Sequence, residues 1–367
     1  MSAALRNERS ERLRAGMRDA GLDLLVVAGD AWRSDYLRYA VDVTPMEGEA
    51  VACLSRDGRS RLFVASPVEA ERVSAELPGL DVSWSGNPLD AAKDFAARWN
   101  PERVGLAPSS AVPWHLAQGP LGQHLSATTG WIDRLMVRKT PAEADAVARS
   151  SLLADAGYAV FRDACKVGRA EYEIVADVET WLRAQGCPEN FIILGSGGRE
   201  LRSMHPPGER RLVAGDLVTT ELTPCVDGYY AQICRTLVMG PPSAVQLRAY
   251  GVFLEALEAG IAAVRPGATH GDVAKAENDV FHRHGLSEFV TSAYTRVRGH
   301  GVGLYVDGPH VLEDVGLVLE PGMTLVVHPN TYHPEAGYIV LGDTVRVTET
   351  GCEALTQVSR SLRSVSL

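Results

Sequence analysis

Two polar residues interrupt apolar, strand-like runs in the second half of the chain. Glu221 follows the run Leu-Val-Thr-Thr, and His328 follows Thr-Leu-Val-Val. Burying an ionisable side chain is costly unless the side chain is paired, hydrogen-bonded or ligated. A hydrogen-bonded pair in the core would meet this requirement, and so would a catalytic cleft. These two residues are therefore the first candidates for chemistry.

Other polar side chains share strand faces near Glu221. Because alternate residues of a strand point to the same side, Thr223 shares a face with Glu221. On the next predicted strand, Tyr230, Gln232 and Cys234 share a face in the same way. We expect Thr223, Tyr230 and Gln232 to contact substrate. A protonated histidine beside Cys234 would favour a nucleophilic thiolate, whereas a small thiol that only fills space is the alternative.

Two further histidines lie beside glycine or proline residues, which set the conformation of the backbone around them. His300 is flanked by glycines in Gly-His-Gly-Val-Gly, which let a backbone close around a substrate or form a plain turn. His205 lies in the rigid loop Ser-Met-His-Pro-Pro-Gly. An imidazole near its ordinary pKa exchanges protons well at neutral pH, so we expect His205 to act as a general acid and base.

Length and charge limit the class of protein. The 367 residues favour two domains. Since 36 Lys and Arg face 46 Asp and Glu without a basic run, nucleic acid and anionic membranes are not expected partners. No apolar run approaches the roughly 18–20 residues that span a bilayer, and the N-terminal residues lack an apolar signal core. We expect a cytoplasmic protein.

The elements that position these residues fall into two parts. Helical and strand patterns alternate over residues 1–130, which predicts a small α/β domain, and residues 131–141 are predicted as a linker. Residues 142–367 contain an internal repeat, with halves at about 142–240 and 241–355. Three matches recur in the same order: Gly168 to Gly186 with Gly267 to Gly285, Gly215 to Glu221 with Gly322 to His328, and Gly228-Tyr229 with Gly337-Tyr338.

These segments together resemble the creatinase and aminopeptidase P family, whose catalytic domain has the pita-bread fold. The resemblance rests on Val-Gly-Arg-Ala-Glu-Tyr-Glu-Ile, His205-Pro ahead of Gly215-Asp-Leu-Val, Gly-His300-Gly-Val-Gly-Leu, Leu-Glu-Pro-Gly322-Met and Asp343-Thr-Val. It implies an α+β pita-bread domain of two related halves after a smaller α/β N-terminal domain. It also implies a homodimer.

The resemblance places the ligands of two metal ions, as the peptidases of this family hold them, at five positions. These positions carry Glu221, Gln232, His300, His328 and Gly342, or Leu341 in place of Gly342 if the alignment shifts by one residue. A dinuclear site needs several carboxylates to neutralise two dications, and one carboxylate does not suffice. We therefore do not expect a dinuclear metallopeptidase. Creatinase, a relative that works without metal, is similar in this respect, and a histidine at the place of His205 shuttles its proton.

The leading hypothesis is thus a metal-independent, creatinase-like hydrolase that cleaves a C–N bond of a small nitrogen-containing metabolite and needs no cofactor. Its catalytic residues would be His205, Glu221, His300, His328 and Cys234. The alternative is a mononuclear metal-dependent or peptidase-like hydrolase, with Glu221, His300 and His328 holding one Zn or Fe ion. Further alternatives are lyase or isomerase chemistry and a non-catalytic pita-bread binding protein.

Overall fold

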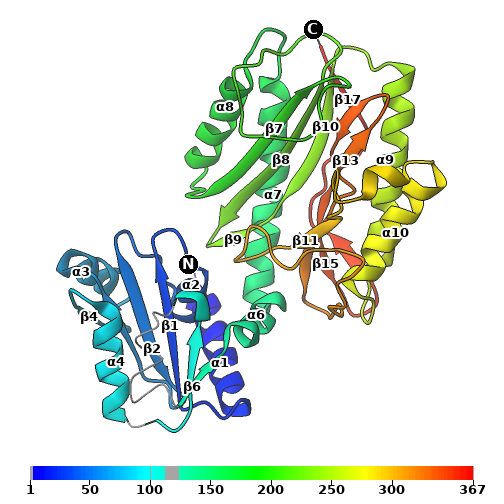
Figure 1. Cartoon of the computed structure of the whole chain (residues 1–367). Coiled ribbons are helices and arrows are strands. Elements are labelled where there is room, and N and C mark those ends of the chain that lie inside the picture. Colours follow the sequence, from blue (N-terminus) through cyan, green and yellow to red (C-terminus); the bar gives the residue numbers. More distant parts are fainter. Residues whose placement is uncertain (1–2, 100, 112–123, 367) are drawn as a thin grey trace. The chain divides into compact units, whose positions relative to one another are not determined.

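A computed structural model describes residues 3–99, 101–111 and 124–366. The chain forms two compact units, Met1–Met136 and Val137–Leu367 (Figure 1). Most of the predicted linker is helical, because α6 (Thr129–Val137) occupies its first part and Thr140 caps α7 (Pro141–Ala164) with a capping box. No helix among the described residues is long and apolar enough to cross a membrane.

The first unit is built on a six-stranded mixed sheet. The run that begins at Asp23 forms the central strand β1 (Leu24–Asp30), which pairs antiparallel with β2 (Glu49–Ser55) and parallel with β5 (Val104–Ala107). The strand order is β4 (Asp81–Trp84), β3 (Ser60–Val64), β2, β1, β5 and β6 (Leu125–Ala127). Helices α1 (Ala3–Asp19), α2 (Asp35–Val41), α3 (Pro67–Glu76) and α4 (Pro88–Trp99) accompany this sheet, and α4 packs on it through Leu89, Ala92 and Ala96.

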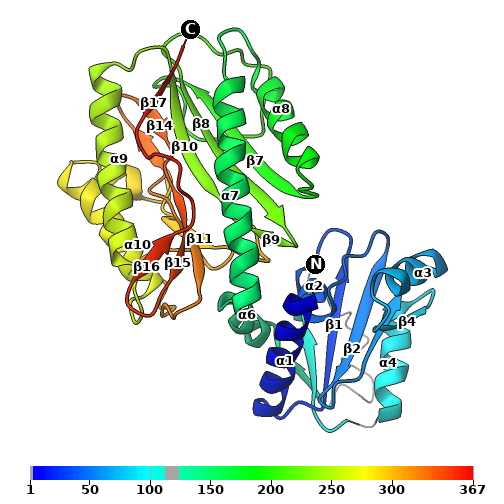
Figure 2. The same cartoon turned by 180° about the vertical axis from the view of Figure 1, so that it is seen from behind.

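The second unit begins with two helices and a sheet. Helices α7 and α8 (Glu171–Ala184) share a buried core with the sheet, and Figure 2 shows α7 running across the back of these strands. The strand order is β17 (Arg363–Val365), β10 (Ile233–Met239), β8 (Leu217–Val226) and β7 (Asn190–Gly197), with β9 (Tyr229–Tyr230) paired to β8. Residues of β8 such as Val218 and Leu222 are fully buried in this core.

A second set of two helices and a sheet follows. Helices α9 (Ala244–Ala263) and α10 (His270–Arg283) share a core with β12 and β15. The sheet order is β11 (Gly299–Gly301), β12 (Thr324–Val327), β15 (Asp343–Val347) and β16 (Cys352–Ala354). A hairpin of β13 (Thr331–His333) and β14 (Gly337–Ile339) lies between β12 and β15 in the sequence.

The two halves use glycine at equivalent turns, as the repeat predicts. Helices α8 and α10 are both 14 residues long. Gly168 and Gly267 precede them with φ of 86° and 84°, and Gly215 and Gly322 precede β8 and β12 with φ of 88° and 89°. These positive φ angles favour glycine, because a Cβ is strained there. The repeat therefore places Glu221 and His328 at matching positions of the two halves.

Candidate active site

The two sheets of the second unit meet where β10 passes β15. Cys234 and Gly342 form an isolated antiparallel bridge, with N–H···O distances of 3.1 Å and 3.0 Å in the two directions. Cys234 is also the direct cross-strand partner of Glu221 in β8. Since opposed residues of an antiparallel pair lie on one face, this junction brings Glu221 and Cys234 together. His328 follows β12 directly and also lies close to Gly342, because a Cβ at position 342 would lie 2.6 Å from His328 Cβ and 3.1 Å from Cys234 Sγ.

Glu221 is a partly accessible carboxylate that the protein surrounds closely. Asn330 Nδ2 donates a hydrogen bond of 2.8 Å to Glu221 Oε1. Burial raises the pKa of Glu221 to about 7, while the hydrogen bonds from Asn330 and Cys234 act to lower it and the charge of Asp307 acts to raise it. At neutral pH this side chain therefore exists in both protonation states, which suits a general acid or base.

The two predicted histidines, His300 and His328, pack against each other edge to face. The ring centroids of His300 and His328 lie 5.4 Å apart, with 62° between the ring planes. His300 Nδ1 donates to the Gly301 carbonyl at 3.0 Å, whereas the buried His328 Nδ1 has no hydrogen-bond partner among the described residues. Burial lowers the pKa of His300, and burial together with the neighbouring His300 lowers the pKa of His328 well below its ordinary value. Both imidazoles are therefore neutral at pH 7.

Gln232 joins two of the other predicted residues. Thr223 Oγ1 donates to Gln232 Oε1 at 3.2 Å, and Gln232 Nε2 donates to Cys234 Sγ at 3.4 Å. Burial and the nearby Glu221 raise the pKa of Cys234 well above its ordinary value, so the residue is a neutral thiol. The raised pKa of Cys234 and the lowered pKa values of His300 and His328 disfavour the thiolate expected next to a protonated histidine.

Tyr230 lies in an apolar cluster at the junction. Its hydroxyl donates to the Glu189 carboxylate. The cluster also contains Cys234, Tyr332 and Tyr338, together with Leu201, Val302, Val326 and Val340. The junction therefore has a polar centre and an apolar, aromatic wall.

His205 lies apart from these residues. It forms a backbone bridge to Leu194, on the edge of β7 that does not pair with β8. Its Nδ1 donates to the Pro206 carbonyl at 2.8 Å and lies 3.8 Å from Glu171 Oε2, and its side chain is 45% exposed. Among the described residues, its hydrogen-bond and ion-pair partners are not members of the junction. The structure therefore does not bring the predicted proton shuttle to Glu221, since the loop follows the outer edge of the sheet.

Asn330 and Arg298 are site residues that the sequence reasoning missed. Besides binding Glu221, Asn330 accepts a hydrogen bond from the Leu341 N–H at 3.0 Å. Arg298 is fully buried and donates to the Asn330 carbonyl at 2.9 Å and to Asn278 Oδ1 at 2.6 Å. A signal for Asn330 was present, because it is a second polar residue two positions after His328. Arg298 precedes the Gly-His-Gly motif but carried no signal of burial.

The junction does not reproduce a site for two metal ions. Among the residues that the structure describes, no group of three or more His, Cys, Asp or Glu side chains is placed to hold a metal ion. A side chain at position 342 has no room, because a Cβ there would lie 2.6 Å from His328 Cβ and 2.9 Å from the Val327 carbonyl oxygen. The backbone at Gly342 therefore approaches its neighbours too closely for the carboxylate that the family's peptidases have there. The family's two-ion site does not fit these side chains.

Comparison with known proteins identifies the family and the fold. Residues 145–349 match metallopeptidase family M24. A protein of Pyrococcus furiosus named Xaa-Pro dipeptidase is 29% identical over 234 residues, which cover 63% of this chain and 66% of that protein. The crystal structure of dipeptidase PepE from Mycobacterium ulcerans is 25% identical and covers 100% of both chains with a TM-score of 0.83. The X-Pro aminopeptidase of Thermotoga maritima is 20% identical, covers 97% of this chain and 99% of its own, and shares the fold with a TM-score of 0.86.

These findings correct the functional prediction and confirm the fold. The prediction of a metal-independent, creatinase-like enzyme that needs no cofactor and is not a dinuclear metallopeptidase is wrong. The matched family is one of metallopeptidases, and the relatives are named dipeptidases. Substitutions at the metal-ligand positions show that the family's two-ion set is incomplete in this chain. They do not establish that the reaction proceeds without metal. The α+β pita-bread fold with a smaller N-terminal domain is confirmed by the structural neighbours. The chain belongs to metallopeptidase family M24.

Proposed function

We propose that this protein is a peptidase-like hydrolase that cleaves a short peptide at the junction of the two halves. The observation that carries this proposal is the hydrogen bond of 2.8 Å from Asn330 to Glu221, because Asn330 lies two positions after His328, whose ring packs against His300. Family membership and the relatives' names, Xaa-Pro dipeptidase and dipeptidase, support a peptide substrate. The match covers 66% of the length of the first of these relatives, slightly less than two thirds.

The chemistry assigned to the chain's own residues is general base catalysis. Glu221 takes a proton from a water molecule, and the water oxygen forms a bond to the carbonyl carbon of the scissile peptide. The N–H of the neutral His328 imidazole donates a hydrogen bond to the resulting oxyanion, since the N–H of His300 is already bound to the Gly301 carbonyl. The C–N bond then breaks, and Glu221 returns its proton to the departing amine nitrogen. No step is assigned to a metal ion, because the described side chains do not assemble its ligands.

The surrounding residues support a substrate with an apolar ring. Tyr230, Tyr332 and Tyr338 belong to one apolar cluster that includes Cys234, the neighbour of Glu221. Aromatic side chains pack well against a compact apolar group such as a prolyl ring. Gln232, held by Thr223, presents an amide at the same place and positions the neutral Cys234 thiol. The homodimer implied by the family resemblance stays a prediction, which light scattering of the purified chain tests.

The test uses the full chain and a panel of dipeptides with and without a C-terminal proline, assayed with and without added Mn²⁺ or Zn²⁺. We expect cleavage of at least one Xaa-Pro dipeptide and a loss of about 100-fold or more in kcat/KM for Glu221→Gln, since the base is removed. Glu288→Gln changes an exposed carboxylate outside the junction and serves as the matched control. Absence of peptide cleavage under all these conditions, or full activity of Glu221→Gln, contradicts the proposal.

A further inference from the structure

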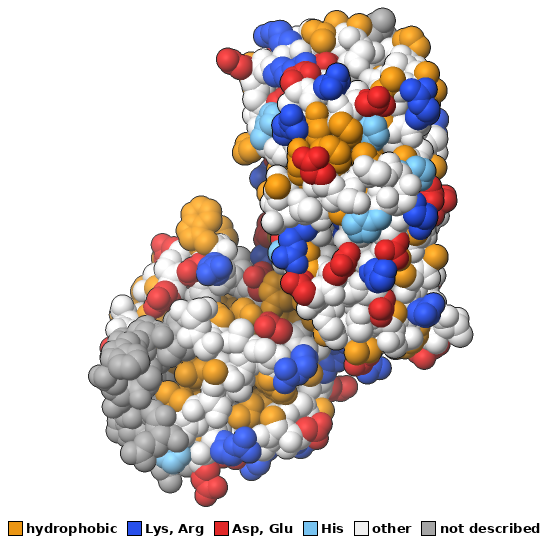
Figure 3. Space-filling model, turned by 45° about the vertical axis from the view of Figure 1, so that its right-hand side comes forward, with side chains coloured by type: hydrophobic (Ala, Val, Ile, Leu, Met, Phe, Trp, Pro, Cys, Tyr) orange, Lys and Arg blue, Asp and Glu red, His pale blue; other side chains and the backbone are white. Residues whose placement is uncertain are grey.

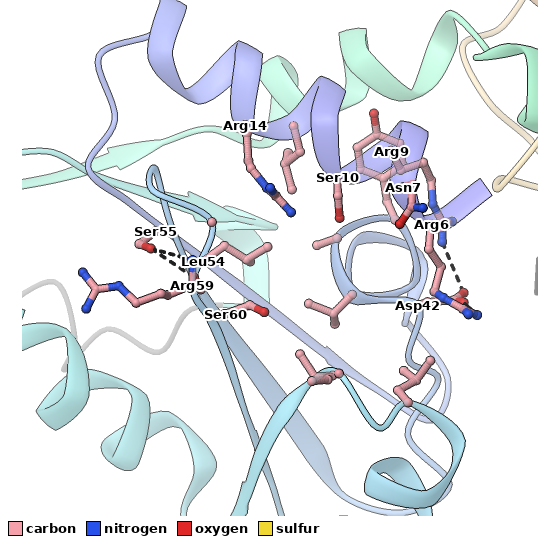
Figure 4. Close-up of a pocket in the computed structure, with 18 of the residues that line it drawn as sticks. Arg6, Asn7, Arg9, Ser10, Arg14, Asp42, Leu54, Ser55, Arg59 and Ser60 are labelled. Carbon is pink, nitrogen blue, oxygen red and sulfur yellow. Dashed lines mark hydrogen bonds and ion pairs between the residues drawn. The ribbon is translucent and has the colours of Figure 1, made fainter. Parts of the chain in front are cut away.

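A cavity of about 390 Å³ lies within the first unit, remote in sequence from every residue assigned above (Figure 4). Its walls are helix α1, the end of α2 with Asp42, the ends of β2 and β3 around their turn, and residues 77–80. The volume is within the range of small-molecule sites. Apolar side chains cover part of its wall: Leu13, Met17, Leu54, Leu77 and Leu80.

Basic side chains are concentrated around this cavity. On the face shown in Figure 3, acidic and basic side chains are intermixed, whereas the cavity wall contains four arginines and one aspartate. That aspartate, Asp42, binds both Arg6 and Arg9, at 3.4 Å and 3.2 Å. Arg59 pairs with Asp57 at 2.6 Å and directs its guanidinium away from the cavity in Figure 4. One carboxylate shared by two guanidinium groups leaves the wall positively charged.

Arg14 is the basic group that faces the open space. Figure 4 shows its guanidinium extending from α1 into the cavity. No hydrogen bond or ion pair joins its side chain to another residue among those that the structure describes. The turn between β2 and β3 leaves room for this guanidinium at Gly58, where φ is 96° and an added Cβ would lie 3.2 Å from Arg14 Nη1.

Polar side chains that suit an anion surround Arg14. Along α1, Ser10 lies three positions after Asn7 and four positions before Arg14. The three residues therefore share one face of the helix. They line the cavity together with Ser60 of β3, whose hydroxyl points into the space in Figure 4. A guanidinium, hydroxyl groups and an amide are the donors that bind phosphate oxygens.

We propose that this cavity binds a small phosphorylated organic molecule. The phosphate dianion contacts Arg14, Ser10 and Ser60, and the organic part packs on the apolar side chains such as Leu54. The positive wall compensates two negative charges, and the apolar lining distinguishes an organic phosphate from free phosphate. The site belongs to the first unit alone and does not depend on the proposed peptidase activity.

The test measures binding to the full-length protein by isothermal titration calorimetry, with phenyl phosphate, inorganic phosphate and malonate as probes. We expect phenyl phosphate to bind most tightly and binding to weaken as salt is added, because charge pairs are screened. Arg14→Ala is expected to weaken phenyl phosphate binding about tenfold or more, since a charge-assisted hydrogen bond is lost. Arg18→Ala, an exposed arginine one turn further along α1 that does not line the cavity, is expected to leave binding unchanged.

Several outcomes overturn the proposal. No binding of either phosphate, or tighter binding of malonate, removes the phosphate assignment, and tighter binding of inorganic phosphate than of phenyl phosphate removes the organic part. An equal loss for Arg14→Ala and Arg18→Ala shows a general charge effect rather than a site. Thermal unfolding of both variants checks that each is folded. Because dipeptide cleavage is measured separately, failure here is distinguishable from failure of the proposed function.

Discussion

Asn330 Nδ2 donates a 2.8 Å hydrogen bond to Glu221 Oε1, and this bond joins a residue that follows β12 of one half to β8 of the other. Asn330 is itself fixed by Arg298, which binds its carbonyl, and by the Leu341 N–H, which binds its Oδ1. Asn330 is thus a positioning residue for the proposed base. Its effect on Glu221 is also electrostatic, because the donated bond stabilises the ionised carboxylate.

Replacement of Asn330 by aspartate therefore gives a specific pH effect. Asn330→Asp keeps the acceptor for Leu341 but replaces the donor to Glu221 with a second negative charge, so the pKa of Glu221 rises. In the pH profile of kcat/KM, we expect the rise that follows ionisation of Glu221 to move to higher pH by about one unit. Such a shift corresponds to about 1.4 kcal/mol of unfavourable interaction with the ionised carboxylate. Asn87→Asp, at an exposed position in the first unit, is the control. An unchanged pH profile shows that the bond does not tune Glu221.

Glu221 is expected to make the protein less stable at alkaline pH. Its folded-state pKa is raised from 4.5 to about 7, so its contribution to stability is fully present below pH 4.5 and is lost as pH rises through 7. Glu221→Gln removes this dependence. Relative to the wild type, we expect the variant to gain about 1–3 kcal/mol in free energy of unfolding between pH 4.5 and pH 8. Urea unfolding at both pH values measures it, and equal changes in Glu288→Gln and Glu221→Gln contradict the assignment.

Gly342 is expected to tolerate no side chain. An added Cβ would lie 2.6 Å from His328 Cβ and 3.1 Å from Cys234 Sγ, so Gly342→Ala forces the two halves apart at their junction. We expect a loss of about 1–3 kcal/mol in the free energy of unfolding. In the matched control Gly351→Ala, the new Cβ has no atom within 4 Å. Similar stabilities of the two variants would show that the junction relaxes freely.

Metal loading tests how many ions the junction holds. Since the two-ion set is reduced to one carboxylate and position 342 has no room for another, we expect fewer than two ions per chain after dialysis against Mn²⁺ or Zn²⁺. Elemental analysis of the dialysed protein gives the ratio, and Glu221→Gln identifies ions that depend on the junction carboxylate. Two ions per chain in the wild type, with loss in Glu221→Gln, means that other groups supply the missing ligands.

Much of the architecture follows from local sequence. Glycine at positions such as Gly168 and Gly267 encodes turns of positive φ, and the apolar, β-branched runs of β8 and β12 encode strands, each with an ionisable residue within it or directly after it. Because both signals act over a few residues, the repeat and the equivalence of Glu221 and His328 were predictable. The chemistry of the reaction was not, since substitutions at ligand positions do not reveal what the remaining residues do.

The sequence by itself determined the two related halves and the polar residues that each contributes to the centre. Only the tertiary structure decided that Asn330 binds Glu221, that His205 lies on the outer edge of β7, and that burial raises the pKa of Cys234. The reason is physical. Turns and strand faces depend on neighbours along the chain, whereas protonation and hydrogen bonding depend on which distant segments exclude water from a group and which donors they bring to it.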